Sequence, residues 1–203
     1  MIRHVLLDAD GVVQTTPDLR RSATAVELVG ERADALLDDL FAAEGPTLVG
    51  AGDFLPELSR ILLEHGIDAE PEGLYGVLWN AVQPSAEVLD LVARLRAAGY
   101  GVHLGTNQHR ERATYMRTML EYDAAFDVGC YSCELGAAKP SAEFFARAAT
   151  LIGAAPGEVL FVDDSPVNVE AARAAGLVAE HWDLAQGLPA LEALLAAHGV
   201  ESR

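Results

Sequence analysis

Paired carboxylates follow two apolar runs of the sequence. Asp8 and Asp10 close the first run, and Asp163 and Asp164 close the second. Side chains two residues apart on an extended segment project to the same side, so one carboxylate can act as a nucleophile while the other transfers protons. In isolation an Asx turn explains Asp-x-Asp-Gly equally well. The apolar run before the pair and the second acidic pair favour a functional site.

Three further polar groups stand near the ends of predicted elements. Thr106 and Asn107 close another apolar run, and Lys139 precedes Pro140. Each has a simpler explanation, because Asn107 can cap the next helix and Lys139 can be an exposed residue before a helix that begins with proline. The N-terminus of a helix also binds anions, so capping and phosphate binding are compatible.

Four converging carboxylates require compensating positive charge. At roughly 5 Å and an effective dielectric constant of about 20, each like-charged pair costs ~3 kcal/mol. Oxygen ligands with room for water and phosphate suit Mg²⁺. A divalent ion together with the Lys139 ammonium would nearly balance the carboxylates and leave a site able to receive a phosphoryl group. The sequence therefore predicts a magnesium site that acts on phosphate.

The elements that must position these residues alternate along the chain. Strands are predicted at residues 4–8, 100–106, 127–132, 158–164 and 177–182. Helices are predicted at residues 85–98, 108–122, 141–153, 168–175 and 188–198. Near-continuous apolar strands that alternate with helices indicate an α/β fold with a parallel sheet covered on both faces. In such a sheet, ligands bind beyond the carboxyl ends of the strands, where the polar groups above are expected to meet.

A helical segment interrupts the alternation after the first strand. Helices are predicted at residues 22–44, 53–65 and 71–82, with interruptions at Gly45-Pro46, Gly50, Gly52 and Gly66. A structureless loop of this length is uncommon, so the segment is predicted to be a small helical subdomain. Its aromatic residues either face a substrate or, as we favour, fill the core of the subdomain; they are Phe41, Phe54, Tyr75 and Trp79.

Composition excludes several classes of partner. The 203 residues carry a formal net charge of −17, and no run of Lys or Arg interrupts it. Such a surface repels nucleic acid and anionic lipid. No stretch reaches the roughly 18 apolar residues of a membrane span, and the N-terminus is unlike a signal peptide. We expect a cytoplasmic protein that binds neither nucleic acid nor membrane.

Two cysteines and one asparagine each allow more than one interpretation. Cys130 and Cys133 can form a redox pair or half of a zinc site, but the absence of a partner pair at ligand spacing favours inert thiols beside a strand. Asn168 either orients Asp164 or Lys139, or faces solvent.

Four short segments together resemble the motifs of the haloacid dehalogenase-like hydrolase superfamily. They are DADGVV at residues 8–13, LGTN at 104–107, KP at 139–140 and VDDSPVN at 162–168. The resemblance covers nearly the whole chain and implies a Rossmann-like core with a small α-helical cap subdomain. The core would comprise residues 1–14 and 85–203, and the cap residues 15–84.

The resemblance also implies roles for individual residues. Asp8 would attack phosphorus and form a phosphoaspartyl intermediate, and Asp10 would serve as acid and then base. Thr106, Asn107 and Lys139 would hold the phosphoryl oxygens. Mg²⁺ would be held by the carboxylates of Asp8 and Asp164, by the backbone carbonyl of Asp10, and by Asp163 directly or through water. The expected substrate is a small phosphorylated metabolite, because a cap occludes large ones.

The chain departs from the pattern of these relatives at two positions. Relatives often have Gly-Asp where this chain has Asp163-Asp164, and many have a second Asp at the position of Asn168. Dehalogenases of the superfamily lack an acid at the position of Asp10, so Asp10 argues for phosphoryl transfer over carbon–halogen cleavage. A sugar phosphomutase, a haloacid dehalogenase and a non-catalytic binding member of the superfamily stay open beside the phosphatase.

Overall fold

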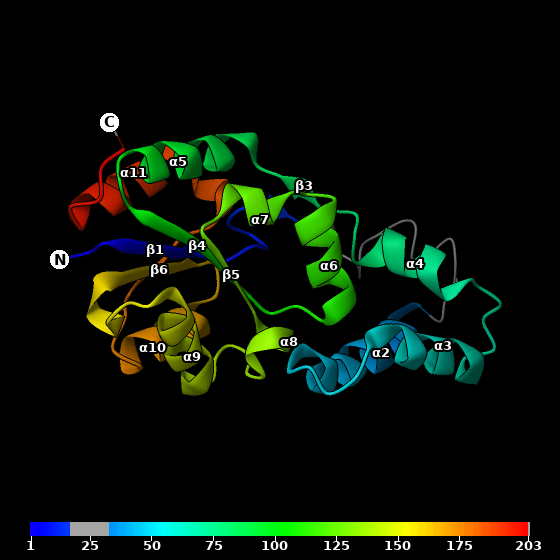
Figure 1. Cartoon of the computed structure of the whole chain (residues 1–203). Helices are drawn as coiled ribbons and strands as arrows, with labels where there is room; N and C mark the ends of the chain where they lie inside the picture. Colours follow the sequence, from blue (N-terminus) through cyan, green and yellow to red (C-terminus); the bar gives the residue numbers. More distant parts are fainter. Residues whose placement is uncertain (17–32, 203) are drawn as a thin grey trace.

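A parallel sheet forms the centre of the protein. The computed structural model describes residues 1–16 and 33–202. The sheet has the strand order β5-β4-β1-β6-β7, and all four pairings are parallel (Figure 1). The strands are β1 (His4–Leu7), β4 (Gly101–Thr106), β5 (Val128–Tyr131), β6 (Val159–Asp163) and β7 (Val178–His181). All five predicted strands are present, and the predicted α/β fold class is confirmed.

Helices cover both faces of the sheet. In Figure 1, α5 and α11 lie over one face and α9 and α10 over the other. Alternate side chains of β1 serve the two faces, since Val5 and Leu7 join one apolar cluster and Leu6 joins another. The helices of this part are α5 (Ala86–Ala97), α6 (Arg110–Thr118), α7 (Tyr122–Ala125), α8 (Ser132–Leu135), α9 (Ala142–Ile152), α10 (Pro166–Ala174) and α11 (Leu188–Ala197).

Helix α6 is shorter than predicted. The sequence favours one helix over residues 108–122, but α6 ends at Thr118 and the short α7 begins at Tyr122. Between them Glu121 adopts the left-handed conformation, with φ at 56°. This conformation is incompatible with a continuous right-handed helix, so the chain changes direction there.

The remaining helices form a separate group with their own core. They are α2 (Ala33–Leu48), α3 (Phe54–Glu64) and α4 (Pro71–Leu78), and they lie to one side of the sheet (Figure 1). Their buried side chains make a distinct cluster that includes Phe54, Tyr75 and Trp79, with Phe41 packed against it. These aromatic residues therefore form the core of the helical segment, as the favoured interpretation predicts. The chain enters and leaves this part through an antiparallel pair, β2 (Gln14–Thr15) and β3 (Gln83–Pro84).

Two predicted boundaries in this segment are wrong. The interruption expected at Gly45-Pro46 is absent, because α2 continues through Pro46 to Leu48. Gly50 follows the end of α2 with φ at 79°, and a Cβ there would lie 2.3 Å from the carbonyl oxygen of Cys133. The helix predicted to reach residue 82 stops at Leu78. The first part of the helix predicted at residues 22–44 lies outside the described residues.

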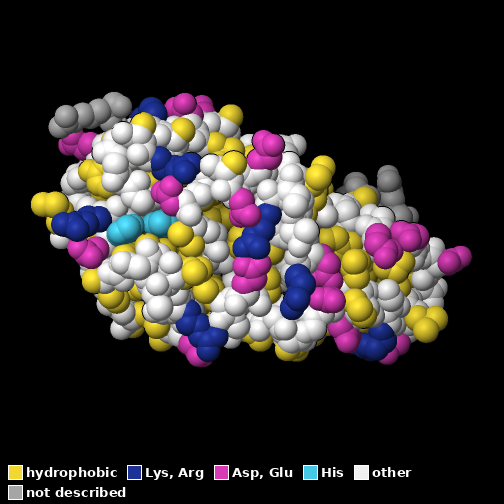
Figure 2. Space-filling view, viewed as in Figure 1, with side chains coloured by type: hydrophobic (Ala, Val, Ile, Leu, Met, Phe, Trp, Pro, Cys, Tyr) yellow, Lys and Arg dark blue, Asp and Glu magenta, His cyan; other side chains and the backbone are white. Residues whose placement is uncertain are grey.

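The face of the molecule drawn in Figure 2 carries charged side chains of both signs. Figure 2 shows Asp and Glu side chains over the sheet domain and the helical segment, with Lys and Arg side chains scattered between them. The charge on this face is therefore dispersed. Among the described residues, no helix has both the length and the apolar character needed to cross a membrane.

A pair of histidines, of which His103 is buried and His4 half-buried, makes the stability of the fold depend on pH. Nδ1 of His4 lies 3.1 Å from Nε2 of His103, whose residue is only 3% exposed. Burial, with His4 adding to it, lowers the pKa of His103 to about 4. Between pH 4 and 6.5 an unfolded histidine therefore binds a proton that the native one does not, and stability rises with pH through this window.

We expect His103→Gln to remove up to about 3 kcal/mol from the rise in the free energy of unfolding across this window. Urea unfolding of both proteins at several values of pH measures it, and the difference between the two curves cancels the other titrating groups. Parallel curves between pH 4 and 6.5 would contradict the assignment.

Candidate active site

The ends of the three central strands bring the predicted site residues to one edge of the sheet. Asp8 directly follows β1, while Thr106 ends β4 and Asp163 ends β6. The parallel register pairs Leu7 of β1 with Leu104 and Val162, so Asp8 and Asp163 lie at the same level and Thr106 lies one residue further along. The backbone N–H of Asp8 extends the ladder by donating to the carbonyl of Val162 at 2.9 Å.

Lys139 lies between two of these carboxylates. Its Nζ is 2.7 Å from Oδ1 of Asp8 and 2.6 Å from Oδ2 of Asp163, and its side chain is 2% exposed. It is the only lysine of the sequence. A lone buried ammonium bonded to two buried carboxylates excludes the interpretation of Lys139 as an exposed residue before a helix.

Asn107 holds Lys139 in place through the main chain. Its Oδ1 accepts a hydrogen bond from the backbone N–H of Lys139 at 2.8 Å, and its Nδ2 donates to the carbonyl of the same residue at 2.9 Å. Both ends of the Asn107 amide are therefore engaged in positioning Lys139. The predicted contact of Asn107 with phosphoryl oxygens stays a prediction.

Asp163 is fixed by four donated hydrogen bonds. Lys139 donates to Oδ2, the backbone N–H of Ser165 donates to Oδ1 at 2.8 Å, and Nδ2 of Asn168 donates to both oxygens at 3.0 and 3.2 Å. The expectation that Asn168 faces solvent is wrong, because its side-chain amide contacts Asp163, and its link to Lys139 runs through Asp163. Asp163 thus anchors the ammonium rather than being free to turn.

Three carboxylates are close enough to share a metal ion. Oxygen atoms of Asp8, Asp163 and Asp164 lie within 4.8 Å of one another. Gly11 makes room for this cluster, since its φ is +80° and a Cβ there would lie 2.3 Å from Oδ2 of Asp164. Three carboxylates against one ammonium leave an excess of negative charge. The donor set of hard oxygens and this excess charge fit Mg²⁺.

Burial and charge shift the pKa values at this cluster. Burial raises the pKa of Asp8, and nearby Asp163 adds to the rise while Lys139 opposes it. Burial disfavours the charged form of Lys139, but Asp8 and Asp163 outweigh it and hold the pKa of Lys139 above its ordinary value. Burial and Asp163 also raise the pKa of Asp164. Burial is the main cause for the two carboxyl groups, and the neighbouring carboxylates reinforce it, whereas for Lys139 the neighbouring carboxylates outweigh burial.

Asp10 lies in a different environment from the other carboxylates. Arg112 donates to both of its oxygens, and Gln14, Thr16 and Gln108 donate to one oxygen each. Burial opposes ionisation of Asp10, but the Arg112 guanidinium and the hydrogen bonds outweigh it and hold the pKa of Asp10 below its ordinary value. Asp10 is therefore a fixed carboxylate in this arrangement.

Thr106 connects the two groups of residues. Its Oγ1 accepts a hydrogen bond from Nε2 of Gln108 at 2.9 Å, and the same nitrogen donates to Oδ2 of Asp10 at 3.0 Å. Sequence reasoning missed Gln14, Gln108 and Arg112. The spacing of Gln108 and Arg112 within the helix predicted at residues 108–122 is a signal that could have paired them, because residues four apart on a helix face the same way, although α6 itself begins at Arg110.

The cysteines are free thiols outside this cluster. Cys130 lies within β5, Cys133 lies in α8, and both are buried. Burial raises the pKa of Cys130 to about 12, so its thiol stays protonated at neutral pH. These facts agree with inert thiols.

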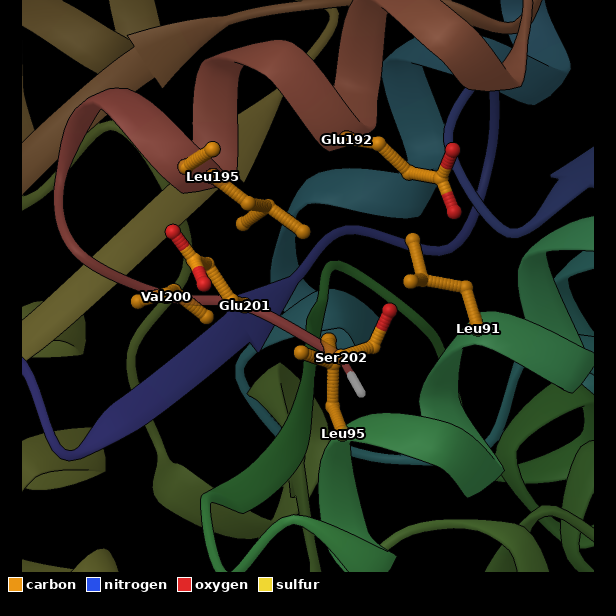
Figure 3. Close-up of a pocket in the computed structure, with 8 residues that line it drawn as sticks. Leu91, Leu95, Glu192, Leu195, Val200, Glu201 and Ser202 are labelled. Atoms are coloured by element: carbon orange, nitrogen blue, oxygen red, sulfur yellow. The ribbon is translucent and has the colours of Figure 1, made fainter.

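A cavity of about 320 Å³ lies apart from the strand-end residues. Figure 3 shows side chains from α5 and α11 around it, together with the segment near the C-terminus. It is lined mainly by leucines and acidic residues and contains none of the groups described above. We assign it no part in the chemistry of the site.

The chain is similar in sequence to several proteins that are named as phosphatases or as a hydrolase. The chain is 34% identical to the sesquiterpene phosphatase astK of Aspergillus oryzae over 104 residues, which cover 50% of the chain and 52% of that protein. It is 27% identical to the flavin mononucleotide hydrolase 1 of Arabidopsis thaliana over 60% of the chain and 49% of the relative. The chain thus matches about half the length of each of these two. An enolase-phosphatase E1 of Synechococcus elongatus is 28% identical over 83% of the chain and 70% of the relative.

Solved structures share the fold. A predicted HAD-like hydrolase from Porphyromonas gingivalis matches with a TM-score of 0.79 and 26% identity, over 96% of this chain and 98% of the other. The HAD family enzyme bt-2542 from Bacteroides thetaiotaomicron, solved with magnesium and inorganic phosphate, matches with a TM-score of 0.74 and 20% identity, over 89% and 94% of the two chains. The profile of the haloacid dehalogenase-like hydrolase family matches residues 2–176 of this chain. The chain therefore belongs to the haloacid dehalogenase-like hydrolase family.

Proposed function

We propose that this hydrolase is a Mg²⁺-dependent phosphatase that cleaves a small phosphorylated metabolite through a phosphoaspartyl intermediate on Asp8. One observation carries the proposal: the buried Lys139 ammonium joins Asp8 to Asp163 beside a third carboxylate, that of Asp164. This arrangement unites a nucleophile, a fixed positive charge and oxygen ligands for a divalent ion, which phosphoryl transfer requires.

Asp8 is the nucleophile in this proposal. Its Oδ1 is engaged by Lys139 and by the backbone N–H of Ala9 at 2.7 Å, so we assign the attack to Oδ2. The new Oδ2–P bond forms as the ester P–O bond breaks. Arg112 favours the ionised form of Asp10, so Asp10 would have to take up a proton in the substrate complex before it gives that proton to the departing alkoxide. Asp10 then takes a proton from the water that attacks phosphorus, which releases inorganic phosphate and regenerates the Asp8 carboxylate.

The remaining residues hold the phosphoryl group and the ion. Lys139 and Thr106 would bind phosphoryl oxygens, and Asn107 keeps Lys139 in position. Mg²⁺ would be held by the carboxylates of Asp8 and Asp164 and by the backbone carbonyl of Asp10, and it would supply positive charge to offset that of the phosphoryl oxygens. We assign Asp163 a supporting place, since its oxygens already accept four hydrogen bonds.

The names of the relatives support phosphate chemistry over carbon–halogen cleavage. Three of the matched proteins are named as a phosphatase, a flavin mononucleotide hydrolase and an enolase-phosphatase. An L-2-haloacid dehalogenase from Xanthobacter autotrophicus also shares the fold, with a TM-score of 0.67 at 17% identity. Asp10 weighs against dehalogenase activity. An acid at this position can protonate the alkoxide that leaves a phosphate ester, whereas a departing halide needs no proton.

The direct test is hydrolysis of p-nitrophenyl phosphate with Mg²⁺ and with EDTA, followed by a panel of phosphorylated metabolites. We expect turnover with Mg²⁺ and its loss with EDTA. Turnover of 2-haloacids without metal would overturn the proposal in favour of a dehalogenase, and inactivity on every phosphate would favour a non-catalytic member. Transfer of phosphate back to a sugar substrate would identify a phosphomutase.

Binding of Mg²⁺ is also expected to stabilise the native protein. At a concentration 100 times its Kd, a ligand of the native state adds about 2.7 kcal/mol, which raises the melting temperature of a chain of this size by roughly 5–10 °C. We expect Asp164→Asn to lose most of this shift and Asp90→Asn, an exposed change on α5, to keep it. Thermal melts with and without Mg²⁺ measure it. Equal shifts in the two variants would remove Asp164 from the metal site.

A further inference from the structure

The start of α6 holds two groups of contacts on opposite sides. Gln108 and Arg112 contact Asp10, while His109 and Glu111 contact the helical segment. Oε1 of Glu111 accepts hydrogen bonds from the first backbone N–H groups of α3 at 2.7 and 2.9 Å. Nδ1 of His109 lies 2.8 Å from the hydroxyl of Tyr75. The turn of α6 that bears Arg112 is therefore fixed on both sides.

Arg112 forms a bidentate salt bridge with Asp10. Its Nη1 donates to Oδ2 of Asp10 at 2.8 Å and its Nη2 donates to Oδ1 at 2.9 Å. The Arg112 side chain is 7% exposed, whereas that of Asp10 is 31% exposed. A guanidinium paired with both oxygens fixes the plane of a carboxylate as well as its distance, which a lysine ammonium cannot do.

Gln108 extends this contact to the predicted phosphate site. Its Oε1 accepts from Nη1 of Arg112 at 3.2 Å, and its Nε2 bridges Asp10 and the hydroxyl of Thr106. The orientation of the Asp10 carboxylate is thereby tied to the residue that ends β4. A chain of short contacts from buried side chains restricts the Asp10 side chain relative to the atoms with which it must exchange protons.

We propose that Arg112 is the positioning residue for Asp10, setting the direction from which its carboxyl group meets the leaving oxygen and the attacking water. This inference rests on the proposed phosphatase function. Arg112 touches neither the phosphoryl group nor the metal in this role, and it acts entirely through Asp10. Misplacement of a catalytic group by about 1 Å can cost on the order of 10²-fold in rate.

The test is a double-mutant cycle on two aryl phosphates. Phenyl phosphate releases a more basic oxygen than p-nitrophenyl phosphate, so it depends more on proton donation by Asp10. We expect Arg112→Lys to lower kcat/KM on phenyl phosphate by roughly 10- to 100-fold and to lower it less on p-nitrophenyl phosphate, because kcat/KM excludes the later hydrolysis step that both substrates share. In an Asp10→Asn background the same change should have no further effect, because Arg112 then has no acid to position.

The control is Arg117→Lys, a change on the same helix at a residue that pairs with Glu134 and Asp123. It should leave both substrates unaffected. Arg112→Met is carried through the same cycle, and melting curves of every variant separate loss of fold from loss of positioning. Equal losses in kcat/KM on both substrates, or a full additional loss in the Asp10→Asn background, would overturn the positioning role. Wild-type protein inactive on both phosphates would instead overturn the proposed function itself.

Discussion

Asp8→Asn is expected to reduce phosphatase turnover by at least about 10³-fold, because the variant has no carboxylate oxygen to attack phosphorus. The change is nearly isosteric, and it removes one member of a crowded group of acids around Lys139. The fold should therefore survive, and the melting temperature should stay close to that of the wild type. The loss then belongs to chemistry rather than to stability.

Two measurements check this expectation. Steady-state hydrolysis of p-nitrophenyl phosphate gives the rate, and the intact mass of acid-quenched protein reports the phosphoryl adduct that the wild type should carry and Asp8→Asn should lack. Asp90→Asn, at an exposed residue of α5, serves as the matched control and should keep both. A variant that retained a tenth of the rate would remove Asp8 from the role of nucleophile.

Lys139→Met is expected to lower stability by about 3–5 kcal/mol, the usual cost of breaking a buried ion pair by removing one partner. Asp8 and Asp163 would remain buried without their counter-charge, so they must bind protons or stay ionised at a high energetic cost. For a chain of this size the melting temperature should fall by roughly 6–20 °C. Catalytic turnover should be lost as well, since no ammonium remains to hold the phosphoryl group.

The source of this effect can be isolated. Adding Asp163→Asn to Lys139→Met removes one of the stranded charges, so the double variant should be more stable than the single one. Arg147→Met, at an exposed residue of α9, is the control for loss of a surface cation. Thermal melts of the four proteins provide the comparison. A Lys139→Met variant that melted within about 2 °C of the wild type would contradict the prediction.

The strands and the convergence of their polar ends were predictable from the sequence. Apolar runs that alternate with helices allow few arrangements other than a parallel sheet, and a parallel sheet gathers the carboxyl ends of its strands at one edge. Asp8 and Asp163 therefore meet for a reason visible in the chain itself. Lys139 was harder to place, because nothing in Lys-Pro distinguishes a buried ammonium from an exposed one.

The surroundings of Asp10 were not predictable in the same way. Arg112 lies 102 positions from Asp10 in the sequence, and its partner depends on how α6 packs after β4. In a sequence with 31 acidic residues, composition does not select the one that this arginine contacts. The helix interruption predicted at Gly45-Pro46 was wrong for a local reason. Pro46 lies near the C-terminal end of α2, and the helix continues through it to Leu48. The assignment of residues 15–84 as a cap stays a prediction.

Because Lys139 is the only lysine of the sequence, these 203 residues carry a single ε-amino group, and that group lies within the candidate site. Amine-directed acylation therefore has one side-chain target in this sequence. Slow acylation of Lys139 would report directly on how often the site opens to solvent.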